Sequence, residues 1–144
     1  LLYIGRGLDY ALSMEGSLKL KEVSYIHSES YAAGELKHGT ISLIDEDVPV
    51  IAVATQTGII PKTISNVVEV KSRGANVILV CTDACARELK DGVADYVIEI
   101  PHTDELLMPI TAVVPLQILA YYTSINRGID PDKPKNLAKS VTVE

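Results

Sequence analysis

The chain has 144 residues, of which 47% are hydrophobic and 22% charged, a composition typical of one soluble globular domain with a sizeable core. Its formal net charge of -6 argues against a nucleic-acid-binding surface, which is usually basic. We expect no signal peptide and no membrane span, because prolines, threonines and tyrosines interrupt the most apolar stretch, residues 106–125.

Short apolar runs alternate with helix-length segments along the chain. We expect strands at residues 1–4, 48–54, 76–80 and 96–100, and helices at residues 10–27, 61–72, 84–89 and 106–126. The apolar runs lack a clean polar–apolar alternation, which is typical of strands covered on both faces in a parallel sheet. The sequence therefore predicts an α/β fold, a three-layer sandwich in which helices flank a mostly parallel sheet in a flavodoxin-like arrangement.

Two segments do not fit this alternation. Residues 28–47 form a long connection that we expect to be irregular, and residues 129–144 form a polar tail with two prolines. Connections of this length are often functional. We predict one domain over residues 1–128 followed by a tail over residues 129–144. Because the chain opens without Met directly into an apolar run, we infer that it was cut out of a longer protein.

The first predicted helix carries an unusual group of charges. Winding residues 10–27 at the helical period gathers small polar residues on one side and most apolar residues on the other. Glu15, Lys19 and Glu22 fall in the middle of the apolar side, and their spacing makes them neighbours. Two interpretations stay open. They form a buried ion-pair network that locks the helix to its neighbours, or a proton-transfer site in which neighbouring charges set which carboxylate is protonated.

Two further residues are candidates for chemistry. His38, in a glycine-flanked loop, could exchange a proton near neutral pH, although a lone loop histidine is more often a surface residue. Lys139 stands in a mildly apolar tail, where a lysine can lose its proton and form a Schiff base with a carbonyl. The alternative is a solvated tail lysine. His27 and His102 have no supporting context, and we interpret them as structural.

Other short patterns are weaker. The turn at residues 55–58 is rich in hydroxyl groups and could hold a phosphate through backbone N–H groups, but it has one glycine and no Walker pattern. The glycine turn at residues 5–7 lacks the dinucleotide fingerprint, so we expect no nicotinamide cofactor. Cys81 and Cys85 are a poor metal site and are interpreted as reduced thiols of a cytoplasmic protein.

Four segments carry a resemblance to a known family. They are residues 5–7, 14–22, 32–39 and 136–144, which read GRG, MEGSLKLKE, AAGELKHG and NLAKSVTVE. These segments closely resemble the isomerase portion of the glucosamine-6-phosphate synthase family, the isomerising glutamine:fructose-6-phosphate aminotransferases. The resemblance runs over essentially the whole chain and corresponds to the second, C-terminal SIS (sugar isomerase) domain of that family.

The resemblance implies an activity and roles for particular residues. The family converts fructose 6-phosphate and glutamine into glucosamine 6-phosphate and glutamate. Glu22 resembles the base that moves a proton between C1 and C2 of the opened sugar, and Lys139 resembles the lysine that forms a Schiff base with the ketose. His38 resembles the histidine that assists ring opening in the partner subunit's site. Such a role implies a homodimer.

Glu15 and Lys19 resemble the pair that relays protons and tunes the base, and Ala138 would contact the substrate beside the Schiff-base lysine. The resemblance implies no metal or organic cofactor, no nucleic acid and no membrane. Family members also carry a glutaminase domain and a first SIS domain whose loop holds the sugar phosphate, so we expect little complete turnover from this chain alone. Two alternatives stay open: a non-catalytic module that senses a sugar phosphate, and a dimerisation module.

Overall fold

In the computed structural model, which describes residues 1–135 and 137, five strands form one sheet. The strands are β1 (Leu2–Gly5), β2 (Glu29–Ala32), β3 (Pro49–Ala54), β4 (Asn76–Thr82) and β5 (Tyr96–Ile100). Their order is β2-β1-β3-β4-β5, and each neighbouring pair is parallel. This is the flavodoxin-like order, so the predicted α/β fold class is confirmed.

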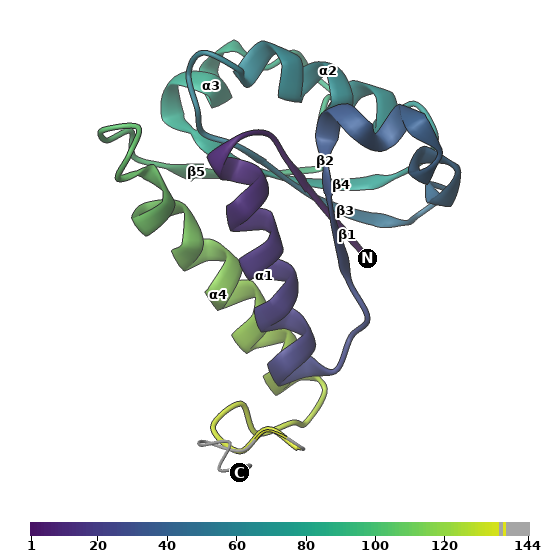
Figure 1. The fold of residues 1–144 in the computed structure, drawn as a ribbon, viewed down its shortest axis with the longest axis vertical. Coiled ribbons are helices and arrows are strands. Elements are labelled where there is room, and N and C mark those ends of the chain that lie inside the picture. Colours follow the sequence, from purple (N-terminus) through teal and green to yellow (C-terminus); the bar gives the residue numbers. More distant parts are fainter. Residues whose placement is uncertain (136, 138–144) are drawn as a thin grey trace, which may run out of the picture.

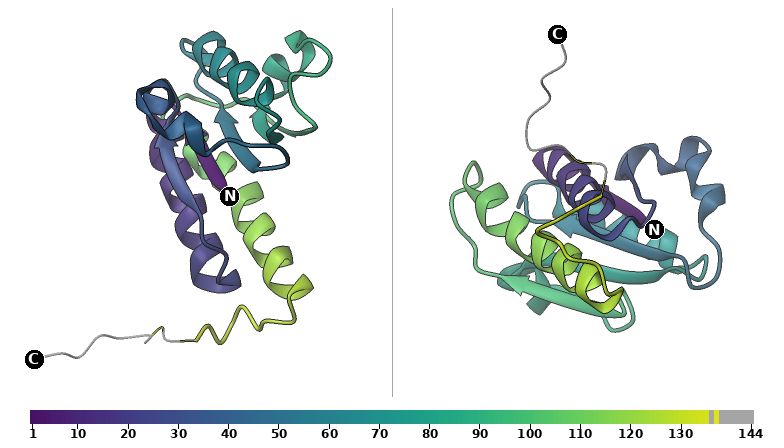
Figure 2. Two further views of the ribbon diagram at one scale, coloured as in Figure 1. Left: turned by 90° about the vertical axis from the view of Figure 1, so that its right-hand side faces the viewer. Right: turned by 90° about the horizontal axis from the view of Figure 1, so that it is seen from below.

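Helices cover both faces of the sheet. One face carries α1 (Leu8–Ser24) and α4 (Met108–Asn126), and the other carries α2 (Ile60–Lys71) and α3 (Asp83–Glu88), as Figures 1 and 2 show. Consecutive strand residues contribute to different cores: Ala52 and Leu79 pack on the α2 side, whereas Ile51 and Val80 pack on the α1 side. Apolar groups are needed on both faces, and this accounts for the unbroken apolar runs in the sequence.

The segment over residues 28–47 is more ordered than we expected. It contains β2 and two 3-10 helices, η1 (Ala33–His38) and η2 (Thr40–Leu43). The prediction missed β2 because this strand has four residues, is only half-buried and pairs with β1 at one edge of the sheet. A short edge strand of mixed polarity gives almost no periodicity signal.

The buried face of α1 is the reverse of the one we expected. The buried residues are mostly small or polar: Asp9, Leu12, Ser13, Gly16, Ser17, Leu20 and Ser24. Met14 and Leu18, on the predicted apolar side, are exposed. A Cβ atom on Gly16 would lie 2.9 Å from Leu116 Cδ1 and 3.0 Å from Tyr3 Cε1, so the missing side chain lets α1 lie close to α4 and β1. The close packing of α1 against α4 and β1 therefore requires small residues on this face of α1.

Our expectation that no segment would be long and apolar enough to cross a membrane is wrong for α4. Within the described residues it passes that test by length and composition, with a mean hydropathy of 1.3. One stripe of α4 is nevertheless buried in the domain: Met108, Ala112, Leu116, Ala120 and Ser124. The hydroxyl of Ser124 donates to the backbone oxygen of Val23 at 2.8 Å, which ties α4 to α1. A helix packed in this way is weak evidence for a membrane span.

Candidate functional site

Glu15, Lys19 and Glu22 form one charge cluster on α1. The Nζ atom of Lys19 lies 2.7 Å from Glu22 Oε2 and 3.5 Å from Glu15 Oε1. The predicted adjacency is therefore observed. The predicted burial is wrong, because the side chains of Glu15, Lys19 and Glu22 are 41%, 33% and 28% exposed. Since water still reaches all three groups, a cluster of this kind contributes little to folding stability.

The electrostatics of the cluster keep Lys19 protonated. The hydrogen bond to Glu22 raises the pKa of Lys19, with further contributions from the charges of Glu22 and Glu15, so Lys19 stays an ammonium ion at neutral pH. An ammonium ion that donates to Glu22 holds that carboxylate in one orientation. A carboxylate fixed beside a cation on an accessible helix face can accept a proton from a bound substrate.

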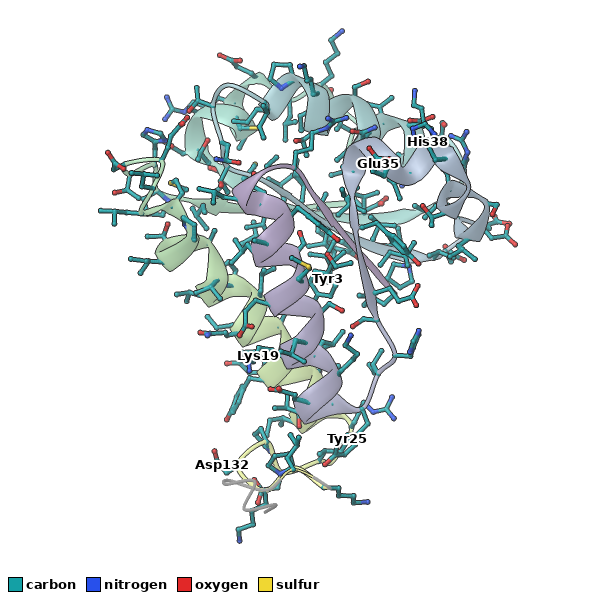
Figure 3. The ribbon with its side chains drawn as sticks, in the orientation of Figure 1. Tyr3, Lys19, Tyr25, Glu35, His38 and Asp132 are labelled. Atoms are coloured by element: carbon teal, nitrogen blue, oxygen red, sulfur yellow. The ribbon has the colours of Figure 1, made fainter. Side chains whose placement is uncertain are left out.

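The cluster lies on the half of α1 that extends beyond the sheet. Figure 3 places Lys19 on this part of α1 and Tyr25 directly after the helix. Asp132, which belongs to the segment after α4, is drawn near the same end of α1. The backbone N–H of Lys135 donates to the hydroxyl of Tyr25, so the chain after α4 returns to the C-terminal end of α1. Two predicted site residues, Ala138 and Lys139, lie outside the described residues.

His38 lies at the end of η1, well away from the cluster. Its side chain is 75% exposed, and its Nε2 atom is 3.8 Å from Glu35 Oε2. Figure 3 shows His38 and Glu35 on the side of the sheet opposite to Lys19. Within one chain, the structure therefore does not bring His38 together with Glu22. His27 and His102 are exposed on the surface.

The turn after β3 lies where ligands bind in sheets of this order, beyond the carboxyl ends of β1 and β3. The backbone N–H groups of Thr55, Gln56 and Thr57 in this turn are already occupied by side chains of the domain. Asp9 Oδ2 accepts from the backbone N–H groups of Thr55 at 2.8 Å and Gln56 at 3.3 Å, and Asp9 Oδ1 accepts from the Thr55 hydroxyl. The N–H of Thr57 donates to Glu105 Oε1 at 3.0 Å. Two carboxylates thus occupy three backbone N–H groups that could otherwise hold a phosphate.

Asp9 is the residue that our sequence analysis missed. It is 2% exposed, and burial raises its pKa although its hydrogen bonds to Thr55 and Gln56 act in the opposite direction. The available signal was an acidic residue in the first turn of a helix that directly follows a glycine turn. Its partner at the end of β3 could not be identified without the sheet order.

The two thiols are buried and lie next to each other. Cys81 on β4 and Cys85 on α3 are free and share a hydrogen bond, which raises the pKa of Cys81 and lowers that of Cys85. Among residues 1–135 and 137, no group of three or more His, Cys, Asp or Glu side chains could hold a metal ion.

Comparison with known proteins identifies the class. The model of the SIS domain family matches residues 1–127, and the chain belongs to this family. It is 58% identical over 144 residues to the isomerising glutamine–fructose-6-phosphate aminotransferase of Clostridium perfringens, covering all of this chain and 24% of that protein. The corresponding protein of Thermococcus kodakarensis is 51% identical over 99% of the chain and 23% of its own length. The chain therefore spans about a quarter of these relatives.

Solved structures agree with this assignment. The C-terminal domain of the glucosamine-fructose-6-phosphate aminotransferase of Francisella tularensis superimposes with a TM-score of 0.87 at 39% identity, over 92% of this chain and 37% of that one. A glucosamine-6-phosphate deaminase from Thermotoga maritima matches with a TM-score of 0.74 at 29% identity, over 97% of this chain and 39% of its own. The sugar isomerase domain of an RpiR transcription factor from Sphaerobacter thermophilus shares the fold at 15% identity.

Proposed function

We propose that this chain is the C-terminal SIS domain of an enzyme that makes glucosamine 6-phosphate from fructose 6-phosphate and glutamine. The observation that carries the proposal is the 2.7 Å contact between Lys19 Nζ and Glu22 Oε2, which fixes a carboxylate on an accessible helix face. The identity of 58% to an aminotransferase of this kind over the whole chain supports it. The chain contributes the ketose-to-aldose step and depends on other domains for the rest.

The proposed reaction uses an imine as the electron sink. The amine of Lys139 adds to the ketose carbonyl at C2 and water leaves, which gives a Schiff base. Ammonia then adds to C2 and the amine of Lys139 leaves, which frees the lysine and leaves an imine of ammonia at C2. The carboxylate of Glu22 takes a proton from C1 and returns it to C2, and the hydroxyl proton of C1 ends on nitrogen, so that an aldehyde at C1 and an amine at C2 result. Lys19 orients Glu22 by hydrogen bonding, and Glu15 balances the charge of Lys19 from its other side. Ala138 would contact the sugar beside the imine.

The proposal requires partners that the chain does not supply. Asp9 and Glu105 accept hydrogen bonds from the turn after β3, which fits a sugar phosphate held by the first SIS domain. The exposed position of His38, away from Glu22, fits a homodimer in which His38 assists ring opening in the partner subunit's site. Ammonia would come from a glutaminase domain of the same polypeptide. We place the enzyme in the cytoplasm, where its two cysteines stay reduced.

Borohydride trapping tests the proposal. Fructose 6-phosphate and borohydride are added to the chain alone and to the chain with the first SIS domain, and mass spectrometry locates the adduct. We expect an adduct confined to Lys139 in the second mixture. Lys139→Arg should abolish it, while the control Lys133→Arg should leave it unchanged. An adduct spread over surface lysines in both mixtures would refute the Schiff-base role.

A sensor function is the second candidate, because an RpiR domain shares this fold. A sensor needs to bind a sugar phosphate but needs no base. In the full-length protein, Glu22→Gln should leave substrate binding nearly intact and abolish isomerisation if the domain is catalytic. A protein that binds a sugar phosphate without any turnover, before and after this change, would be a sensor.

A further inference from the structure

A cationic cavity opens beside the carboxyl end of β1. It has a volume of about 390 Å³ and lies between β1, η1 and α2. Three of the side chains that line it are the cations of Arg6, Lys37 and Lys62, and Ser65 and Asn66 add a hydroxyl and an amide. Among the residues that the structure describes, no carboxylate lines the cavity. Three cations around one cavity are unexpected in a chain whose formal net charge is -6.

Arg6 is held in place without a counter-ion. Its guanidinium donates through Nε at 3.1 Å and Nη2 at 3.0 Å to the same acceptor, Oδ1 of the buried Asn66. Within residues 1–135 and 137, no carboxylate lies within 4.0 Å of this half-buried guanidinium. A guanidinium has five N–H donors, and a neutral amide oxygen does not balance its charge. An oriented and partly desolvated cation of this kind is suited to bind an anion.

The other two cations come from the two elements that border the cavity with β1, Lys37 from η1 and Lys62 from α2. Lys37 Nζ is 3.4 Å from Glu69 Oε2, so part of its charge is already balanced. Lys62 is exposed on the first turn of α2 and has no ion-pair partner in the described part of the chain. Gly34 completes the wall, because a Cβ atom there would lie 2.8 Å from Arg6 Nη2. The absence of a side chain at Gly34 lets the guanidinium lie against the backbone of η1.

We propose that this cavity binds a phosphate group. The planar fork of an arginine presents paired N–H donors that match two oxygens of a phosphate, and the flanking lysines match its second negative charge. The site uses none of the residues of the Glu15–Lys19–Glu22 cluster and none of the turn at residues 55–58. A phosphate bound here would connect the ends of β1 and α2 to η1, the element that carries His38.

Titration calorimetry of the 144-residue chain with inorganic phosphate in a low-chloride buffer tests the proposal. We expect saturable binding with one site. Lys62→Ala should weaken it about fivefold, because it removes one accessible charge. Arg6→Gln should abolish it, since a neutral amide cannot replace the oriented cation. The matched control is Lys21→Ala, an exposed lysine on α1 that does not line the cavity.

Each outcome decides the question. Equal weakening by Lys62→Ala and Lys21→Ala, or no saturable binding, would overturn the proposal. If Arg6→Gln fails to fold by circular dichroism, the comparison of Lys62→Ala with Lys21→Ala decides alone, together with the phosphate-induced shift of the Gly34 amide signal in NMR spectra. That signal should move in the unmodified chain, and an unmoved signal contradicts a site beside η1. The titration is then repeated with a phosphomonoester. Tighter binding of the phosphomonoester would identify an organic phosphate as the preferred ligand, and tighter binding of inorganic phosphate would identify the free ion.

Discussion

Asp9 holds Thr55 by two hydrogen bonds, one from the backbone N–H at 2.8 Å and one from the hydroxyl. This contact joins the first turn of α1 to the end of β3 across the point where ligands bind in many parallel sheets. A side chain of the domain thus occupies a position that a phosphate could fill. The N–H and hydroxyl of Thr55 are therefore not available to a bound anion.

Removing the Asp9 carboxylate should destabilise the domain. Asp9→Ala leaves the buried N–H and hydroxyl of Thr55 without an acceptor, and we expect the free energy of unfolding in urea to fall by about 2–4 kcal/mol. Asp83→Ala is the matched control, because it removes an exposed carboxylate whose ion pair with Arg87 lies on the surface. The control should change the free energy by less than about 1 kcal/mol. Equal effects of the two substitutions would contradict the structural role of Asp9.

The raised pKa of Asp9 predicts a particular pH dependence. Because burial raises this pKa in the folded state, the folded protein binds more protons than the unfolded chain between the ordinary carboxyl pKa and the raised value. The Asp9 contribution to stability therefore decreases as pH rises through this interval. Asp9→Asn cannot ionise, so its free energy of unfolding should fall less steeply over the same pH range. Urea titrations at several pH values measure the difference, and parallel curves would disprove the assignment.

Gly16 should be intolerant of the smallest side chain. Alanine favours helices over glycine by about 1 kcal/mol, so propensity alone predicts that Gly16→Ala stabilises α1. The structure predicts the opposite, because the added Cβ would lie 2.9 Å from Leu116 Cδ1. Overpacking of this kind typically costs about 1–3 kcal/mol, and thermal unfolding should show a lower midpoint. Gly58→Ala is the control, since nothing lies within 4 Å of a Cβ atom there.

The proposed base gives a prediction for the full-length enzyme. Glu22→Gln should lower kcat for glucosamine 6-phosphate formation by about 10²- to 10⁴-fold, because it removes the group that moves the proton. Its urea midpoint should stay within experimental error, since the ion pair with Lys19 is partly exposed. Lys21→Ala, on the same helix and outside the cluster, should keep full activity. A Glu22→Gln enzyme with normal kcat would show that another group is the base.

Features that depend on local sequence patterns were predicted correctly, whereas contacts between residues far apart in the chain were not. The apolar runs identified β1, β3 and β4 because buried parallel strands need apolar groups on both faces. The edge strand β5 was identified by its apolar run although it is largely exposed. The adjacency of Lys19 and Glu22 was predictable because helical spacing is a local property. By contrast, the contact between Asp9 and Thr55 joins residues far apart in the chain, and no local pattern encodes it.

The reversed face of α1 has a different cause. Hydropathy patterns treat Ser13, Ser17 and Ser24 as surface residues, whereas the structure buries all three. Ser13 and Ser24 satisfy their hydroxyls on backbone oxygens one turn earlier, and Ser17 bonds to Ser28. Hydroxyls satisfied in this way can enter a close helix contact at little cost. A rule based on hydrophobicity alone assigns such a helix face to solvent.

The purely parallel sheet also has a consequence for how the chain folds. Leu2 pairs with both Glu29 and Val50, Pro49 pairs with Asn76, and Ile78 pairs with Tyr96. Each of these pairings closes a loop that contains at least one helix, so no two strands can meet as a hairpin. Loop-closure entropy therefore opposes every sheet contact before packing can offset it. During synthesis on the ribosome, β1 must wait for β3 to emerge, and its apolar residues stay without their central partner until then.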